Sequence, residues 1–371
     1  MRLIQTTAAL PAGRGIVPTL AAAVLQAVLQ GVLLAAPLAA QERERHTIRG
    51  NDVAVYNLAG ELRLEAGSGS EVVVEVTRGG RGAASLRVQT GRIRDRETLR
   101  VIYPDDRIVY PEGDRGSRDQ ISVRDDGTFG DHDRWGDGRR VTIARSGGGL
   151  EAHADLTVHV PKGQRISVYL GAGKATVTNV DGDVLVDVSS ASVTTRGTRG
   201  RLVLDTGSGE VSVSDAEGEV DLDTGSGDVR LANIKGRRLR VDAGSGSLSG
   251  DKIAVPSLSL DLGSGGTQLS GVTADDIDID SGSGSVDVSL LSDVRSLIVD
   301  SGSGSVTLRV PPTLGASVDI ETGSGGIETD LPIAVTRRSG SRIVGTIGNG
   351  AGRIRIDSGS GEVRFVKGSR D

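Results

Sequence analysis

A Gly-Ser-Gly triplet that returns at a nearly fixed interval is the feature that most constrains this chain. The steps between successive triplets are 18, 19, 19, 19, 20 and 21 residues, and one more copy follows after a longer gap. The triplets begin at Gly207, Gly225, Gly244, Gly263, Gly282, Gly302, Gly323 and Gly359. Self-similarity at such a period predicts a solenoid, in which each repeat is one coil and packs only on its neighbours.

Aliphatic and polar residues alternate on both sides of each triplet. Leu202 and Leu204 precede the first triplet, and Val211 and Val213 follow it. A period of two is typical of strands, so each coil is expected to supply two short ones. Coils stacked about 4.8 Å apart would place like positions over like. The predicted interior column consists of Leu204, Leu222, Val241, Leu260, Ile279, Val299 and Ile320.

The triplet itself is predicted to form the corner between two strands. Glycine suits a corner because it adopts positive φ and lets successive backbones approach closely. Residues 187–191 (Asp-Val-Ser-Ser-Ala) occupy the equivalent place without either glycine. Either positive φ is not needed in every coil, or that corner differs. A phosphate-binding loop is a poor alternative, because such a loop occurs once, before a helix, and not between strands in every coil.

Composition indicates which kind of core this chain can build. It has 55 glycines but only two Phe, four Tyr and one Trp, so a thin core of stacked aliphatic side chains fits better than a broad globular one. The predicted fold is all-β: a parallel β-helix or β-solenoid of 18–21-residue coils with Gly-Ser-Gly corners, preceded by a small N-terminal β module.

The N-terminal segment 1–40 is predicted to be a secretory signal peptide cleaved after Ala40. It carries Arg2 and Arg14, an apolar run at 20–34 and small residues before the predicted cut. An uncleaved anchor is the alternative, although that run is shorter than the ~20 residues a membrane span needs. The predicted divisions that follow are an N-terminal β module (41–165) with a charged insertion at about 105–140, a solenoid (166–366) and a tail (367–371).

Charge and cysteine content narrow the function classes. The chain has no cysteine, so disulfides, thiolate metal sites and cysteine nucleophiles are excluded. Loss of Arg2 and Arg14 with the signal peptide would leave 41 basic and 49 acidic residues, a net charge of −8. This balance disfavours binding to nucleic acid or to an anionic membrane surface. We expect an exported protein of the periplasm, the outer cell surface or the extracellular space, with no membrane span after the signal peptide.

Several segments outside the regular coils resemble a known family. They are Asn57–Leu62, Leu156–Gly163, Gly345–Gly350 and Asp357–Val363. With the triplets, they are similar to the bacterial adhesin family of domains of unknown function, which is related to the head domains of autotransporter adhesins. The resemblance covers most of the chain after the signal peptide. It implies a β-helix-like fold and an envelope or surface setting, and it carries no catalytic residues to transfer.

The charged segment within residues 78–145 interrupts the repeat, and its part at about 105–140 is predicted to be a mobile insertion loop. Its aspartates lack the spacing of a known calcium loop, so a solvated loop is favoured over a calcium site; they are Asp125, Asp126, Asp131, Asp133 and Asp137. Its aromatic residues suggest either a recognition tip or rings buried against the solenoid. They are Tyr103, Tyr110, Phe129 and Trp135.

No catalytic or cofactor-binding residues are predicted. The four histidines, at positions 46, 132, 153 and 159, all precede the coils, and each triplet serine has equivalent surroundings without a local base. We therefore expect a non-catalytic binding or adhesion module whose partner is an unidentified envelope glycan or protein. The alternatives are a polysaccharide-acting β-helix enzyme, which would need paired carboxylates in a groove, and a structural solenoid that self-assembles through exposed end strands.

An acidic residue precedes nearly every corner. The set is Asp205, Asp223, Asp242, Asp261, Asp280, Asp300, Glu321 and Asp357. Stacked coils would turn it into a ladder of like charge, in which neighbours in water repel by about 1 kcal/mol. The favoured interpretation is that each carboxylate accepts hydrogen bonds from backbone N–H groups of its own corner. The alternative is that adjacent carboxylates share a divalent cation such as calcium.

Overall fold

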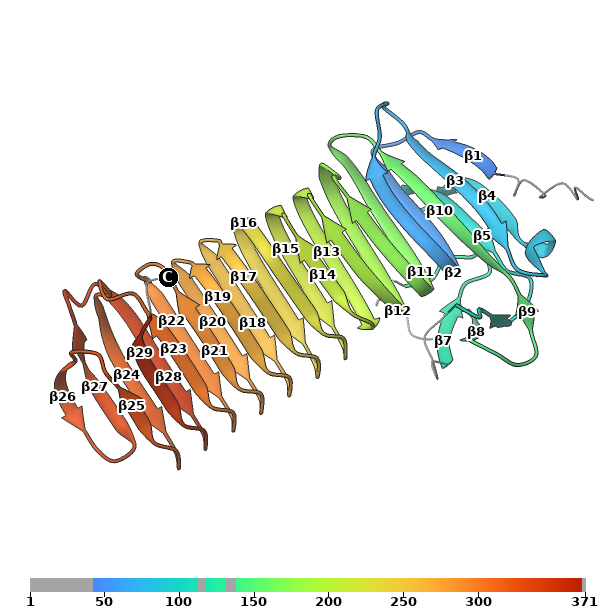
Figure 1. Cartoon of the computed structure of the whole chain (residues 1–371). Helices are drawn as coiled ribbons and strands as arrows, with labels where there is room; N and C mark the ends of the chain where they lie inside the picture. The colour runs from blue at the N-terminus through green and yellow to red at the C-terminus, as the bar shows by residue number, and fades with distance from the viewer. Residues whose placement is uncertain (1–42, 113–117, 131–137, 369–371) are drawn as a thin grey trace, which may run out of the picture. The chain divides into compact units, whose positions relative to one another are not determined.

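The computed structural model describes residues 43–112, 118–130 and 138–368, which belong to one compact unit, Arg43–Asp371. Strands account for the regular structure of these residues, apart from one short 3₁₀ helix, Ala83–Ser85. Figure 1 shows the strands stacked side by side as successive coils. Most neighbouring strands of the coils pair in parallel, so the predicted all-β solenoid is confirmed.

Two parallel layers of strands form the walls of the regular coils, one before and one after the corners. The strands that precede the corners are β13 (Arg199–Ser208), β15 (Glu217–Thr224), β18 (Ser257–Leu262), β20 (Asp276–Ser281) and β22 (Ser296–Ser301). Those that follow them are β14 (Val211–Ser214), β17 (Leu248–Ala254), β19 (Thr267–Thr273), β21 (Val286–Leu290) and β23 (Val306–Val310), while β16 (Val229–Ala243) contributes to both layers. Alternate side chains of each strand are buried between the layers, as the period of two predicts.

The first coils are built from long strands that run through the corner without a break. These strands are β2 (Asp52–Ala66), β11 (Gln164–Thr178) and β12 (Gly182–Arg196). Strand β12 contains the corner without glycines, so that corner differs from the later ones, as one of the two interpretations proposed. The predicted boundary between the N-terminal module and the solenoid, between residues 165 and 166, stays a prediction. Strand β2 from the predicted module pairs in parallel with β11, most of which belongs to the predicted solenoid.

Antiparallel strands cover the N-terminal end of both layers. Strand β4 (Arg87–Ile93) pairs with β5 (Arg96–Ile102), which lies next to the first half of β2. On the second half of β2, β10 (His153–Val160) is followed by β3 (Val72–Gly79) and β1 (Arg43–Ile48).

The insertion between β5 and β10 folds into a second sheet of four strands. They are β6 (Arg107–Val109), β7 (Arg118–Val123), β8 (Arg139–Ala144) and β9 (Leu150–Glu151). The prediction of a mobile loop is therefore wrong for these strands. Tyr103, Tyr110 and Phe129 are buried, which excludes them as an exposed recognition tip. Trp135, His132 and the aspartates at 131, 133 and 137 lie outside the described residues.

The C-terminal end departs from sequence order. The strands involved are β24 (Ala316–Thr322), β25 (Ile327–Thr329), β26 (Ala334–Arg338), β27 (Arg342–Ile347), β28 (Gly352–Ser358) and β29 (Val363–Lys367). Strand β28 lies between β22 and β24, and β29 lies between β23 and β25. The predicted interior column is wrong at this point, because Ile356 separates Val299 from Ile320. Strands β27 and β26 then cover β24 in antiparallel pairing.

The corner glycines are required by close approach between coils. A Cβ atom on Gly263 would lie 2.0 Å from the carbonyl oxygen of Gly244 in the preceding coil, and one on Gly265 would lie 1.9 Å from that of Gly246. The other predicted reason for glycine at the corners, a positive φ, is wrong for most of them. Among the triplet glycines only Gly209 has a positive φ, at +131°. Proximity to the neighbouring backbone thus selects glycine.

We predict that Gly263→Val destabilises the solenoid by about 2–4 kcal/mol, because the new side chain cannot fit against the backbone of the preceding coil. Gly266→Ala is the matched control, since a Cβ there would come no closer than 4.0 Å to its nearest neighbour. Thermal unfolding followed by circular dichroism measures both. Equal melting temperatures for the two variants would contradict the argument.

Candidate functional site

The acidic residues before the corners form one continuous column on the outer face. In spatial order it runs Asp187, Asp205, Asp223, Asp242, Asp261, Asp280, Asp300, Asp357 and Glu321. We call these nine residues the acidic column. The predicted ladder is therefore brought together in register, with one addition and one change of order. Asp187 begins the column, and Asp357 lies between Asp300 and Glu321.

Toward the N-terminus, the same column of positions changes from acidic to aromatic. Asp187 pairs with Tyr169, which pairs with Tyr56. The two rings stack 4.5 Å apart, and the Phe129 ring from the insertion meets them edge-on at 5.8 and 6.4 Å. All three rings are buried. The insertion thus covers the aromatic part of the column, while the acidic part keeps its contact with solvent.

Backbone N–H groups of the corners have other acceptors than the acidic column. The N–H of Gly263 donates to the carbonyl of Ala243 at 2.8 Å, and that of Ser264 donates to Gly244 at 3.0 Å. The predicted capping by Asp261 is wrong for these two donors. The Ser281 hydroxyl supports its corner instead, donating to the carbonyl of Gly284 at 2.9 Å.

Arginines offset part of the repulsion in the acidic column. Asp242 lies 3.7 Å from Arg240, and Asp357 lies 3.4 Å from Arg355, each two residues earlier on the same strand. Glu321 pairs with Arg342 of the antiparallel cap at 3.0 Å. No group of three or more His, Cys, Asp or Glu side chains within the described residues is placed to hold a metal ion. The calcium interpretation stays a prediction.

The described histidines are separate strand residues. His46 lies 3.4 Å from Glu44, and His159 lies 3.9 Å from Glu75. The His153 ring is tilted against that of Tyr110, with centroids 5.5 Å apart. Each histidine contacts a different neighbour, so the three do not share one site.

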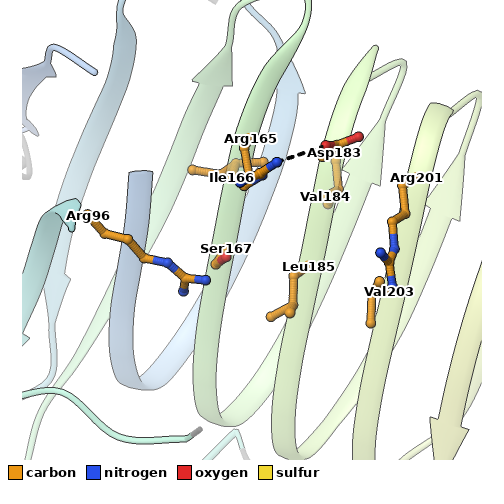
Figure 2. Close-up of a pocket in the computed structure, with 9 residues that line it drawn as sticks. All are labelled: Arg96, Arg165, Ile166, Ser167, Asp183, Val184, Leu185, Arg201 and Val203. Atoms are coloured by element: carbon orange, nitrogen blue, oxygen red, sulfur yellow. Dashed lines mark ion pairs between the residues drawn. The ribbon is translucent and has the colours of Figure 1, made fainter. Parts of the chain in front are cut away.

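A groove lies beside the acidic column, on the outer face of the early coils. It encloses about 280 Å³. Its lining consists of Arg96, Arg165, Ile166, Ser167, Asp183, Val184, Leu185, Arg201 and Val203. We call it the arginine groove. Figure 2 shows the arginines around an apolar strip that faces outward from β12 and β13.

The floor of the arginine groove follows from the strand register. Ser167, Leu185 and Val203 occupy one outward column on β11, β12 and β13. Leu185 and Val203 are only half-buried. The next coil places Asp221 in this column, so the apolar strip ends there.

Opposite charges alternate along the rim. Arg165 lies between two carboxylates, 3.8 Å from Asp52 and 3.7 Å from Asp183. Arg96 lies 3.5 Å from Asp52 and donates to the Tyr169 hydroxyl at 3.2 Å. The side chains of Arg165 and Arg201 remain 61% and 53% exposed, so both guanidinium groups are accessible to a ligand.

The arginine groove was not among the sites predicted from the sequence. Its floor left a signal, because Leu185 and Val203 are aliphatic at outward positions where later coils have Asp221 and Arg240. No signal in the sequence indicated Arg96, since this residue belongs to the segment that interrupts the repeat and reaches the groove only through the pairing of β5 with β2.

Comparisons with known proteins give a family match and a match to a solved structure. The family model described as Toastrack DUF4097 matches residues 115–365. The solved structure of a "putative cell adhesion protein" from Clostridium sporogenes ATCC 15579 is similar to 88% of this chain and 99% of its own, with 7% identity and a TM-score of 0.20. No curated protein matches. Across the described residues, we find no helix long and apolar enough to cross a membrane.

The acidic column should respond to pH at Asp242. Burial, then repulsion from Asp223 and Asp261, raises the pKa of Asp242 above its ordinary 3.8, and Arg240 opposes this rise. A carboxyl whose pKa is raised by folding destabilises the fold when ionised, above that raised pKa. This penalty disappears as the pH falls below the ordinary value.

We therefore predict that Asp242→Asn raises the melting temperature at pH 7 by about 1–3 °C, because a charge that is still partly exposed to solvent is worth under about 1 kcal/mol. The gain should shrink below about pH 4. Asp278→Asn is the control, since Ser259 and Ile298 are its uncharged register neighbours. Calorimetry across this pH range measures both variants, and a lower melting temperature for Asp242→Asn at pH 7 would refute the prediction.

Proposed function

The chain belongs to the Toastrack DUF4097 family, and we propose that it is an exported, non-catalytic binding module that holds an acidic envelope glycan in the arginine groove. The observation that carries this proposal is the pairing of exposed arginines with an apolar floor. Export rests on the predicted signal peptide at 1–40.

The shape and chemistry of the groove suit a sugar chain. Leu185 and Val203 offer a half-buried apolar strip against which the C–H face of a sugar ring can pack. Arg165 and Asp183 provide donors and acceptors for hydroxyl groups along the rim. The groove lies on a sheet face, so an extended polymer can lie along it.

Charge favours a polymer with spaced carboxylates. Exposed guanidinium groups of Arg165 and Arg201 present paired donors that match a carboxylate. Asp187 and Asp205 of the acidic column are two residues further along the same strands as the groove floor. They would repel a polymer as densely charged as a nucleic acid. A uronic-acid glycan places neutral surface between its charges and meets both conditions.

Two features support binding over the alternative functions. Glycoside hydrolysis requires a pair of carboxyl groups free to act on a bound sugar, whereas the two carboxylates at this groove, Asp52 and Asp183, both lie within 3.8 Å of Arg165. Assembly by continued parallel stacking of coils needs a parallel edge at each end, whereas the layer that precedes the corners ends in antiparallel strands, β4 at one end and β27 followed by β26 at the other.

Titration of polygalacturonate, with dextran as the neutral comparison, tests the proposal by calorimetry. We predict preferential binding of the acidic polymer and a roughly tenfold or greater loss of affinity in the double variant Arg165→Gln/Arg201→Gln, because charge-assisted hydrogen bonds contribute about 1.5–3 kcal/mol each.

Arg230→Gln/Arg364→Gln is the matched control. These arginines are similarly exposed, at 52% and 51%, and lie on strands that follow the corners. This variant should bind as the unmodified protein does. Equal loss in both double variants would indicate unspecific attraction of the polymer, and unchanged binding in the groove variant would exclude the groove.

A further inference from the structure

The coil formed by β28 and β29 comes last in the described chain but next to last in space. Figure 1 shows it in dark red between β22/β23 and β24/β25. It pairs in parallel with both neighbouring coils. We call the space it fills the slot.

The coil is held in the slot by its core and by hydrogen bonds on both sides. Ile354, Ile356, Val363 and Phe365 are each 0% exposed. Its corner N–H at Gly359 donates to Ser301 of the coil on one side. The Gly323 N–H of the coil on the other side donates to Ser358.

What the slot recognises is the repeat pattern. Val299 of β22 pairs with Ile279 on one edge and with Ile356 on the other, in the same register. Asp300 likewise pairs with Asp280 and Asp357. An occupant therefore needs alternating aliphatic residues, an acid, a hydroxyl residue and a glycine corner at fixed positions, a pattern that this chain itself carries.

The link to the slot coil is short and turn-like. In the described chain, residues 348–351 connect β27 to β28, and Gly348 and Gly350 both have positive φ, at +55° and +67°. A change of direction at this link would carry β28 and β29 away together while leaving β24 and β27 paired.

We infer that the slot is an interaction surface for a second copy of this chain, whose own β28/β29 coil it accepts by exchange. Each copy would place its coil in the slot of the other, giving a closed, reciprocal dimer. The exchanged coil makes the same strand pairs and the same core contacts as before, so no new interface has to exist. This inference is independent of the arginine groove.

Cysteine pairs in the full-length chain test the exchange, because the chain has no native cysteine. Ile298 and Arg355 are register neighbours across the slot. One preparation carries Ile298→Cys and the other Arg355→Cys. The two are mixed at high concentration under reducing conditions at the onset of unfolding, returned to native conditions and oxidised. Disulfide-linked heterodimers are counted on non-reducing gels.

Ser259→Cys and Asp278→Cys form the matched control pair, in register on β18 and β20 within the regular stack. We expect several-fold more heterodimer from the slot pair than from this control. Equal yields would overturn the inference. The double variant Ile298→Cys/Arg355→Cys should close an internal disulfide when oxidised alone and at low concentration. If it does not, the register of the slot is wrong and the inference fails with it.

Discussion

Contact between the backbones of successive corners is the constraint on which the rest of this structure depends. Carbonyl oxygens of one corner lie where the Cβ atoms of the next would be, as Gly263 over Gly244 illustrates. Such proximity fixes the register of each coil on the one before it. Register in turn aligns the interior aliphatic residues, the acidic column and the floor of the arginine groove, so the surface features follow from the same constraint as the core.

The sequence predicted the periodic part of the fold and missed what interrupts it. Alternation around the triplets correctly identified two strands per coil and an interior column through Leu204 and Ile279, because identical coils stack in only one way. The order of the last coils could not be read, since Ile320 and Ile356 sit in equivalent patterns and either could follow Val299. The loop prediction for the insertion failed because its charged residues masked strands as short as Arg107–Val109.

The candidate sites differ in the same way, since the repeated one was predictable from the sequence and the irregular one was not. The acidic column was predictable from one repeated position, whereas the hydrogen bonds of the corners were not. The corner N–H groups donate to carbonyl oxygens of the preceding coil, and these acceptors come into reach only when the coils stack. The arginine groove includes Arg96, which comes from a distant segment of the chain. The residues next to Arg96 in the sequence do not predict its position in the groove. The sequence signal of this site was a departure from the repeat, namely aliphatic Leu185 and Val203 at outward positions.

Because the coils stack in strict register, the number of coils also sets the distance between the two capped ends. Gain or loss of one repeat of about 19 residues would move the two capped ends apart or together by about 4.8 Å while each column kept its neighbours. A change of one or two residues within a repeat would instead move aliphatic side chains onto the wrong face or displace a corner glycine. Duplication of whole repeats therefore offers such a chain a way to set the reach between its ends without redesigning its core.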